Sequence, residues 1–209
     1  MSRRTYHHGD LREALVRAAL ELIRQKGHAG FTFADAARAA GVSPAAPYRH
    51  FRDRDELMID IARRGFEQFE AALSKAWNRG QPDALRALQR MGAAYLEFAR
   101  AEPAYYSSMF EAGIPAQADP ALAQAGERAF GVLLAAAEAL TLLLPAAGRP
   151  PARMIALHIW ALSHGIASLF GRGDEGRRAL PMPAQDLLEA GVLVYLHGLG
   201  LGGPPRPAG

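Results

Sequence analysis

The chain has 209 residues, which is enough for one or two domains and a sizeable hydrophobic core. Hydrophobic residues make up 50% and charged residues 22% of it, a globular composition that excludes wholesale disorder, and the absence of cysteine excludes disulfides, thiol nucleophiles and cysteine-bound metals. The net charge is +3, yet residues 1–52 carry nine basic and four acidic side chains, so a polyanionic partner is expected for this segment only.

The start of the chain, residues 1–10, has no apolar run that would serve as a secretory signal. Residues 154–171 lack Asp, Glu, Lys and Arg, and these 18 positions are near the lower limit of about 17–25 residues for a membrane-spanning helix. Because the stretch contains His158, Ser163 and His164, a buried helix is the better interpretation. We therefore expect a cytoplasmic protein without a membrane partner.

Helical spacing of apolar residues extends over most of the chain, and its 43 alanines favour helix over strand. The first helix is predicted to begin at Asp10, with Glu13 completing a capping box, and to end at Gly27, because glycine tolerates the left-handed conformation that follows a helix. Thr32 is the expected N-cap of a short second helix, which ends at Gly41.

A short third helix is predicted after the turn at Gly41. Ser43 is its expected N-cap and Pro44 its first residue, because that position has no use for an N–H donor. Pro47 stands at the fourth helical position and removes the first internal hydrogen bond, to the Ser43 carbonyl. The helix is expected to end near Phe51.

Asp53 and Glu56 form another capping box, which opens a long fourth helix. Glycine- and proline-rich breaks then separate five further helices. The sequence therefore predicts an all-α protein of about nine helices, the last five at about 83–101, 103–110, 121–144, 152–171 and 184–198.

The second and third helices, joined by a tight glycine turn and preceded by another helix, have the arrangement of a helix-turn-helix. In that motif the second helix of the pair is narrow enough to enter the major groove of DNA. An ordinary helical hairpin also uses glycine turns, so the arrangement alone leaves both interpretations open.

Three stretches of this region decide between them: Phe31-Thr32-Phe33-Ala34-Asp35-Ala36-Ala37, Ala40-Gly41-Val42-Ser43, and Tyr48-Arg49-His50-Phe51-Arg52-Asp53-Arg54-Asp55-Glu56-Leu57. Without a gap over about residues 8–58, they resemble the DNA-binding domain of the TetR family of transcriptional regulators. The resemblance implies a three-helix DNA-binding domain in residues 1–55 and a helical ligand-binding and dimerisation domain in residues 56–198. Residues 199–209, rich in glycine and proline, are expected to form a disordered tail.

The resemblance also implies which residues contact DNA. Four residues match positions that hold phosphates in the family: Thr32, Tyr48, His50 and Arg54. The family usually has Lys in place of Arg54. For Tyr48, the alternative role is packing of its ring against the first helix. Side chains in the first turn of the third helix offer no hydrogen bond to a base, so specificity is expected to rest on Arg49, on DNA shape or on an N-terminal arm. The alternative interpretation of the arm is a disordered, solvated terminus. The expected DNA-binding residues are Thr32, Ser43, Pro44, Ala45, Ala46, Tyr48, Arg49, His50, Arg54, Arg3 and Arg4.

The segment Trp160-Ala161-Leu162-Ser163-His164-Gly165 resembles a C-terminal domain class of the same family that carries a Trp, His and Gly signature. Trp160 and His164 lie on one helix face, either as a pocket wall or as a core contact, and His164 is the expected polar group for a ligand. The expected ligand-binding residues are Tyr95, Phe98, Tyr106, Met109, Phe110, Phe130, Trp160 and His164, with core packing as the alternative.

Stripes of small residues on the last two helices fall where the family usually forms a four-helix dimer bundle. Such stripes also serve packing within one subunit, which is the alternative. The expected dimer-interface residues are Ala161, Gly165, Ser168, Gly191, Val194 and Gly198.

Taken together, the resemblance implies a homodimeric, ligand-responsive repressor that a small hydrophobic effector releases from a palindromic double-stranded DNA operator. No cofactor and no metal are expected. A DNA-binding architectural or activating protein without a ligand is the alternative function. An enzyme is the least favoured, because no recognisable catalytic set is present in the sequence.

Overall fold

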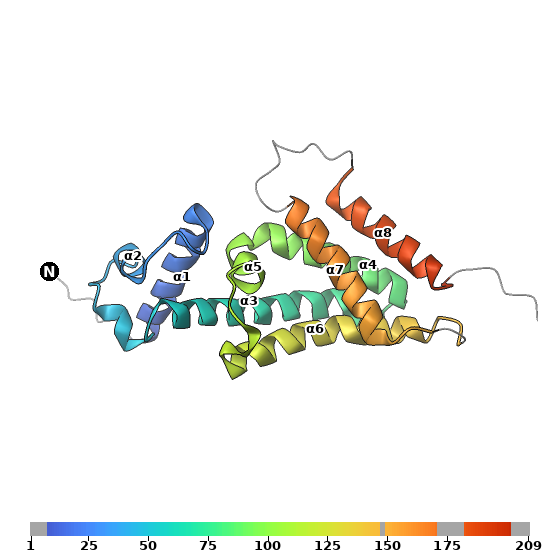
Figure 1. The fold of residues 1–209 in the computed structure, drawn as a ribbon, viewed down its shortest axis with the longest axis horizontal. Coiled ribbons are helices and arrows are strands. Elements are labelled where there is room, and N and C mark those ends of the chain that lie inside the picture. Colours follow the sequence, from blue (N-terminus) through green and yellow to red (C-terminus); the bar gives the residue numbers. More distant parts are fainter. Residues whose placement is uncertain (1–7, 147–148, 171–181, 202–209) are drawn as a thin grey trace, which may run out of the picture. The chain divides into compact units, whose positions relative to one another are not determined.

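The computed structural model of the protein describes residues 8–146, 149–170 and 182–201. These residues form eight α-helices and three short 3-10 helices, and no strand occurs among them (Figure 1). The all-α prediction is therefore confirmed. None of the described helices is long and apolar enough to cross a membrane.

The helices form two compact units. The first contains residues up to 68 together with 102–126, and the second contains residues 69–101 together with those from 127 onward. The expected domain boundary after residue 55 does not coincide with the edge of the first unit, because the start of the long α3 (Arg54–Trp77) and the segment around α5 (Pro103–Phe110) belong to the same compact body.

The first unit is built on α1 (His8–Lys26), α2 (Phe33–Ala39), the 3-10 helix η1 (Ala46–Arg49), the first part of α3, and α5. It also holds η3 (Ala116–Ala118) and the beginning of α6 (Pro120–Thr141). Its apolar core joins α1, α2, the first part of α3 and Ala104 of α5. The central members of that core are Leu15, Ile23, Phe51, Leu57 and Ile61.

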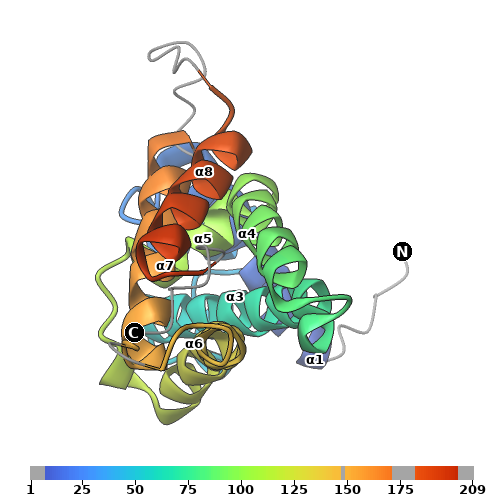
Figure 2. The same ribbon diagram turned by 90° about the vertical axis from the view of Figure 1, so that its right-hand side faces the viewer.

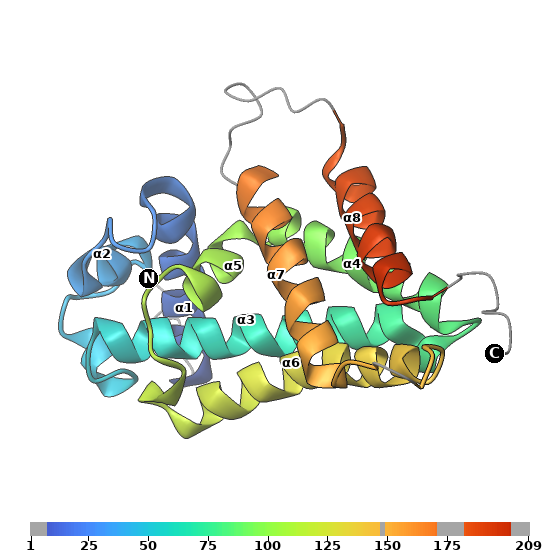
Figure 3. The same ribbon diagram turned by 45° about the vertical axis from the view of Figure 1, so that its right-hand side comes forward.

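The second unit is built on the end of α3, η2 (Asn78–Gly80), α4 (Ala84–Ala101), most of α6, α7 (Ala152–Phe170) and α8 (Ala184–Gly198). Helices α4, α7 and α8 lie side by side (Figures 2 and 3). Its buried apolar residues include Leu88, Met91, Leu140, Ile155 and Leu196.

The helix ends follow local signals in the sequence. Gly27, at φ +76°, ends α1 as predicted, and the helix begins at His8, two residues before the predicted start. Thr32 and Asp35 form a complete capping box at the start of α2, and Gly41 adopts φ +74° just after its end. These three positions confirm the predicted boundaries of the second helix.

The predicted disordered tail begins too early. Gly200 takes φ +91°, in the left-handed region that favours glycine, and the N–H of Leu201 donates to the Leu196 carbonyl at 3.1 Å. Leu201 is only 7% exposed, so residues 199–201 are an ordered end of α8. The remaining tail residues, 202–209, lie outside the described residues.

Candidate functional site

Hydrogen bonds at both ends of α2 define the helix-turn-helix. The Thr32 hydroxyl accepts from the Asp35 N–H at 3.1 Å, and the Asp35 carboxylate accepts from the Thr32 N–H at 2.9 Å. The Thr32 hydroxyl also donates to the Asp35 carboxylate at 2.7 Å, and the two bonds that this carboxylate accepts from the Thr32 backbone and side chain hold the pKa of Asp35 below its usual range. Beyond α2, the Val42 N–H donates to the Ala37 carbonyl at 3.0 Å, which closes the helix end around Gly41.

The predicted third helix is wrong in type and extent. It is a four-residue 3-10 helix, η1, whose N-cap is Ala45 without a side-chain bond, in place of an α-helix capped by Ser43. Pro47 explains the difference, because it has no N–H to donate to the Ser43 carbonyl in an α-helical bond. The Ser43 carbonyl, to which Pro47 cannot donate, accepts from the Ala46 N–H at 3.0 Å in a 3-10 turn.

The side chains around η1 form the exposed edge of the motif. Ser43, Pro44, Ala45, Tyr48 and Arg49 are exposed, whereas Ala46 and His50 are half-buried. The Tyr48 ring meets the Phe33 ring of α2 edge-on, with centroids 5.1 Å apart and planes at 87°, so the ring packs on α2. Tyr48 nevertheless remains 62% exposed, which leaves it open to a partner.

Arg54, the first residue of α3, is engaged with the loop between α1 and α2. Its Nε donates to the Phe31 carbonyl at 3.1 Å, and its terminal nitrogen donates to the His28 carbonyl. The guanidinium also lies over the Phe31 ring, 4.7 Å from the centroid. A planar guanidinium can make two such bonds and stack at the same time, whereas an ammonium group cannot, which explains why Arg suits this position where the family usually has Lys.

Helix α3 begins with a modified capping box. Asp53 accepts from the Glu56 N–H at 2.8 Å, as predicted, but the Glu56 carboxylate reaches back one residue further than expected, to the Arg52 N–H at 2.6 Å. The Glu56 backbone bond is the main reason that the pKa of Asp53 lies below its usual range. Because α3 begins at Arg54, shortly after η1 ends at Arg49, the positive end of its dipole lies near the exposed edge of the motif.

An ion-pair network that the sequence analysis missed fastens α1 to α3. Asp60 of α3 is 5% exposed and accepts from Arg12 of α1 at 3.0 Å, from Arg63 at 2.8 Å and from Arg64 at 2.8 Å. Arg64 in turn donates two bonds of 2.7 Å to Glu13 of α1. The i, i+3 and i, i+4 spacing of Asp60 to Arg63 and Arg64 was a readable signal for part of this network.

The network changes the titration of its carboxylates. Burial raises the pKa of Asp60, but hydrogen bonds from Arg63 and Arg12 outweigh that effect, and the pKa is lower than usual. The Arg64 hydrogen bonds likewise lower the pKa of Glu13. Arg12 also lies 4.6 Å from the centre of the Phe51 ring, so the network extends to the segment that follows η1.

Arg3 and Arg4, the expected arm residues, lie outside the described residues. The other expected DNA-binding residues all belong to the first unit, within the segment from Thr32 to Arg54. The structure thus gathers them in one helix-turn-helix.

The eight expected ligand-binding residues do not share a unit. Tyr106, Met109 and Phe110 belong to the first, where the Tyr106 and Phe110 rings lie 4.9 Å apart and Met109 covers Gly65. The other five belong to the second: Tyr95, Phe98, Phe130, Trp160 and His164.

In the second unit, the aromatic side chains contact one another in pairs. Tyr95 and Phe98 both pack on Phe69, with centroids 5.0 and 5.1 Å away. Phe130 and Trp160 lie 6.2 Å apart. The Tyr95 hydroxyl is 3.3 Å from Nδ1 of His164, so these two predicted residues form one hydrogen-bonded pair.

A narrow cavity of about 30 Å³ lies in the second unit beside Tyr95. Helices α3, α4, α6, α7 and α8 all contribute to its wall, and its sequence signal was weak because aliphatic residues at helical spacing look like ordinary core. Its lining is Leu73, Leu88, Met91, Gly92, Tyr95, Leu133, Ile159, Ser163, Leu188 and Val192.

The expected dimer residues fall into two groups. Ala161, Gly165, Val194 and Gly198 are exposed, and Val194 is 72% exposed. Ser168 is half-buried. A Cβ atom on Gly165 or Gly198 would meet nothing within 4 Å, so these positions are open to another molecule.

Gly191 differs from this group. A Cβ atom there would lie 2.9 Å from Cδ2 of Leu162, which places Gly191 in the contact between α8 and α7 of the same chain. Packing within one subunit, the alternative to a dimer contact, accounts for this glycine. Exposed Met154, Leu157 and Leu169 extend the apolar surface of α7.

Comparison with known proteins assigns both parts of the chain. Residues 15–61 match a family model described as bacterial regulatory proteins of the tetR family. Residues 88–195, about half of the chain, match a model described as a tetracyclin repressor-like C-terminal domain.

Individual proteins give a consistent picture. The HTH-type transcriptional regulator CymR of Pseudomonas putida is 49% identical over 45 residues, which span only 22% of this chain and 22% of that relative. A solved protein of unknown function from Rhodococcus sp. RHA1 is 28% identical with a TM-score of 0.77, over 95% of this chain and 99% of the other. The TetR family transcriptional regulator PfmR from Thermus thermophilus has a TM-score of 0.68 over 88% and 98% of the two chains, and at 20% identity this likeness shows the fold alone.

Proposed function

Because this chain belongs to the TetR family of DNA-binding transcriptional regulators, we propose that it is a ligand-responsive repressor, released from its operator by a small hydrophobic effector. The observation that carries the proposal is the exposed edge of the helix-turn-helix, where Tyr48 and Arg49 project beside the start of α3. This edge lies in the part of the chain that is rich in basic residues.

The proposed contacts divide into anchoring and reading. Thr32, Tyr48, His50 and Arg54 hold phosphates through hydroxyl, imidazole and guanidinium donors, which fixes the position of the motif without reading sequence. Arg49 reads a base edge, because a guanidinium can donate two hydrogen bonds to guanine in the major groove. Pro44, Ala45 and Ala46 of the short η1 segment offer only apolar contacts, for instance to a thymine methyl group.

The active form is a homodimer that acts in the cytoplasm. The exposed apolar and small residues of α7 and α8, among them Gly165, Val194 and Gly198, supply a surface of the kind that marks a protein interface. A two-fold dimer requires two half-sites on one face of the DNA, which makes the operator palindromic.

The effector binds in the cavity beside Tyr95, whose charge-poor lining favours a mainly apolar compound. Its binding favours a conformation whose recognition elements no longer fit the half-sites, so DNA release follows from different affinities for two states. His164 acts on the effector through its hydrogen bond with Tyr95.

A selection experiment tests the proposal. The protein is mixed with a random-sequence duplex library, the bound DNA is sequenced, and the affinity of the enriched duplex is followed by fluorescence anisotropy at several salt concentrations. A palindromic site with strongly salt-dependent binding is expected. If no sequence is enriched, an architectural DNA-binding protein becomes the better explanation. If no compound of a metabolite library releases the protein from its selected site, the proposed ligand response is wrong.

A further inference from the structure

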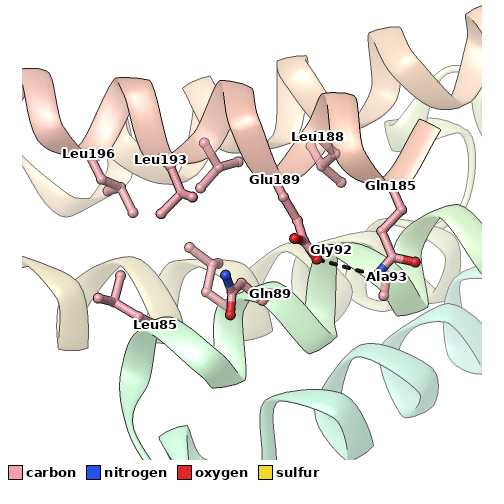
Figure 4. Close-up of a pocket in the computed structure, with 11 residues that line it drawn as sticks. Leu85, Gln89, Gly92, Ala93, Gln185, Leu188, Glu189, Leu193 and Leu196 are labelled. Carbon is pink, nitrogen blue, oxygen red and sulfur yellow. Dashed lines mark hydrogen bonds between the residues drawn. The ribbon is translucent and has the colours of Figure 1, made fainter. Parts of the chain in front are cut away.

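A second apolar space adjoins the cavity beside Tyr95. It is a narrow groove of about 30 Å³ between α4 and α8, and Figure 4 shows Leu193 and Leu196 of α8 directed toward α4, with Leu188 above Gly92. Its described lining is Leu85, Leu88, Gln89, Gly92, Ala93, Gln185, Leu188, Glu189, Val192, Leu193 and Leu196.

The groove and the cavity lie on the two sides of one shared wall. Both are lined by Leu88 and Gly92 of α4 and by Leu188 and Val192 of α8, so these four residues separate the surface from the interior. The partition is tight, because a Cβ atom on Gly92 would lie 3.1 Å from Cδ2 of Leu188. Any larger residue at this place would require the Leu188 side chain to shift by a few tenths of an ångström.

The polar groups differ between the inner cavity and the mouth of the groove. At the inner end, the Ser163 hydroxyl donates to the Ile159 carbonyl at 2.8 Å and the Tyr95 hydroxyl pairs with His164, so both already have hydrogen-bond partners. At the outer end, Gln185 donates to Glu189 at 3.2 Å (Figure 4). Glu189 is the single charged residue among the described residues that line the two spaces.

We propose that the α4–α8 groove is the entrance for the effector, and that the effector is an aliphatic amphiphile with a neutral or cationic head group. This inference rests on the proposed effector response and specifies its ligand. The apolar chain passes Leu188 and Val192 into the cavity, where the polar groups require nothing from it. The head group stays at the mouth, where the carboxylate of Glu189 attracts a cation and repels an anion.

The groove also explains how the site opens. The passage is narrow, so a chain enters only when the Leu188 side chain moves away from Gly92. Widening the partition should speed entry, and filling it should slow entry. A general loss of fold stability would instead change both kinds of variant in the same direction, which separates a gate from a merely structural contact.

The entrance is tested with full-length protein and the neutral fluorescent probe N-phenyl-1-naphthylamine, followed by stopped-flow fluorescence. Leu188→Ala should raise the association rate constant at least fivefold, and Gly92→Val should lower it at least tenfold. Gly131→Val on α6 is the matched control, because a Cβ atom there meets nothing within 4 Å, and it should leave the rate unchanged. Equal association rate constants in the wild type and the three variants would contradict the proposed entrance.

The ligand class is tested by displacing the probe with decylamine, 1-decanol and decanoate, each below its critical micelle concentration. Decylamine and decanol should displace it, and decanoate should need at least a tenfold higher concentration. Glu189→Gln should bring decanoate within threefold of decanol. Displacement by decanoate as readily as by decylamine in the wild type would overturn the class, as would the failure of any probe to bind.

These results are separable from the proposed function. If the protein selects no DNA but shows the expected probe kinetics, the repressor proposal fails while the entrance stands. If it binds its operator and the probe kinetics do not respond to Gly92→Val and Leu188→Ala, the entrance fails while the repressor proposal stands.

Discussion

Arg54 and Phe31 are joined twice: the Arg54 Nε donates a 3.1 Å hydrogen bond to the Phe31 carbonyl, and the guanidinium lies 4.7 Å from the centre of the Phe31 ring. Through these contacts the first residue of α3 holds the loop that leads into α2. The same side chain is the proposed phosphate contact at the start of α3, so one residue combines a structural and a DNA-binding role.

The two roles of Arg54 predict different results for two substitutions. Arg54→Ala should reduce the free energy of unfolding by about 1.5–3 kcal/mol, because hydrogen bonds from a charged donor are lost, and should weaken binding to all DNA sequences alike. Arg54→Lys keeps the charge but not the paired bonds, so it should lower stability while retaining most of the salt dependence of binding. Urea unfolding and anisotropy at several salt concentrations measure both effects. An Arg54→Ala protein that binds DNA as tightly as the wild type at moderate salt would refute the phosphate contact.

Arg49 should determine sequence preference. Arg49→Ala is expected to cost about 1–3 kcal/mol of discrimination at one base pair of each half-site, since a guanidinium that reads a base edge is lost. Tyr48→Phe is the matched variant on the same element, and by removing a phosphate donor it should weaken binding to every site by a similar factor. Sequencing of selected DNA from both variants checks this, and an unchanged preference in Arg49→Ala would assign base reading to another residue.

The helix ends of the motif were predictable because their causes are local. Thr32 and Asp35 cap α2 from three residues apart, and Gly27 and Gly41 supply the left-handed turns, so short stretches of sequence contain all that is needed. The effect of Pro47 on the Ser43 carbonyl was predictable for the same reason. The element becomes a 3-10 helix because the loss of the Pro47 donor weighs heavily in so short a segment, and helical spacing alone does not predict this.

Contacts between distant segments were not predictable. The bonds of Asp60 with Arg12, and of Glu13 with Arg64, require that α1 and α3 pack together, which no local pattern specifies. The aromatic residues between Tyr95 and Phe110 are close in sequence, yet they divide between two units at residue 102.

Asp60 should make stability depend on acidity. Its pKa is lower in the folded protein than in the unfolded chain, where a carboxyl of this kind titrates near about 3.9, so the stabilisation is complete above that value. It is lost as the pH falls through the lower folded value, because the folded state must then take up a proton that it holds less readily. Asp60→Asn should lower stability at pH 7 by about 3 kcal/mol, because it leaves the surrounding guanidinium groups without their shared carboxylate.

The control for Asp60 is Glu13→Gln, which removes a half-exposed carboxylate from the same partner, Arg64, and should cost less, about 1 kcal/mol. Urea midpoints between about pH 2 and pH 7 give the comparison, because the loss lies below the unfolded value of about 3.9. The acid loss should be smaller in Asp60→Asn than in the wild type. A wild-type midpoint independent of pH over this range would show that the network does not govern acid stability.

The two glycines of the predicted dimer surface should behave differently. Gly165 faces open space, so Gly165→Leu should hinder the dimer while leaving the melting temperature of the chain nearly unchanged. A Cβ atom on Gly191 would lie 2.9 Å from Cδ2 of Leu162, so Gly191→Leu should overpack the α7–α8 contact and reduce the free energy of unfolding by about 1–3 kcal/mol. Light scattering gives the oligomeric state and thermal unfolding gives the stability. A wild-type protein that is monomeric at micromolar concentration would defeat the homodimer.

The last prediction concerns His164, whose Nδ1 lies 3.3 Å from the Tyr95 hydroxyl at the inner end of the cavity. His164→Ala removes this partner and leaves a tyrosine hydroxyl to be satisfied beside an apolar ligand, so the affinity for the effector should fall about tenfold, or about 1.4 kcal/mol. DNA affinity without ligand should stay near the wild-type value, because His164 belongs to the second unit and the helix-turn-helix to the first. Release of operator DNA by decylamine and binding of N-phenyl-1-naphthylamine measure the two effects. His158→Ala is the control, since His158 pairs with Tyr195, which does not line the cavity, and it should respond like the wild type. If His164→Ala loses DNA binding and melts several degrees lower, His164 is a structural residue, and the group that orients the effector has to be sought elsewhere on the cavity wall.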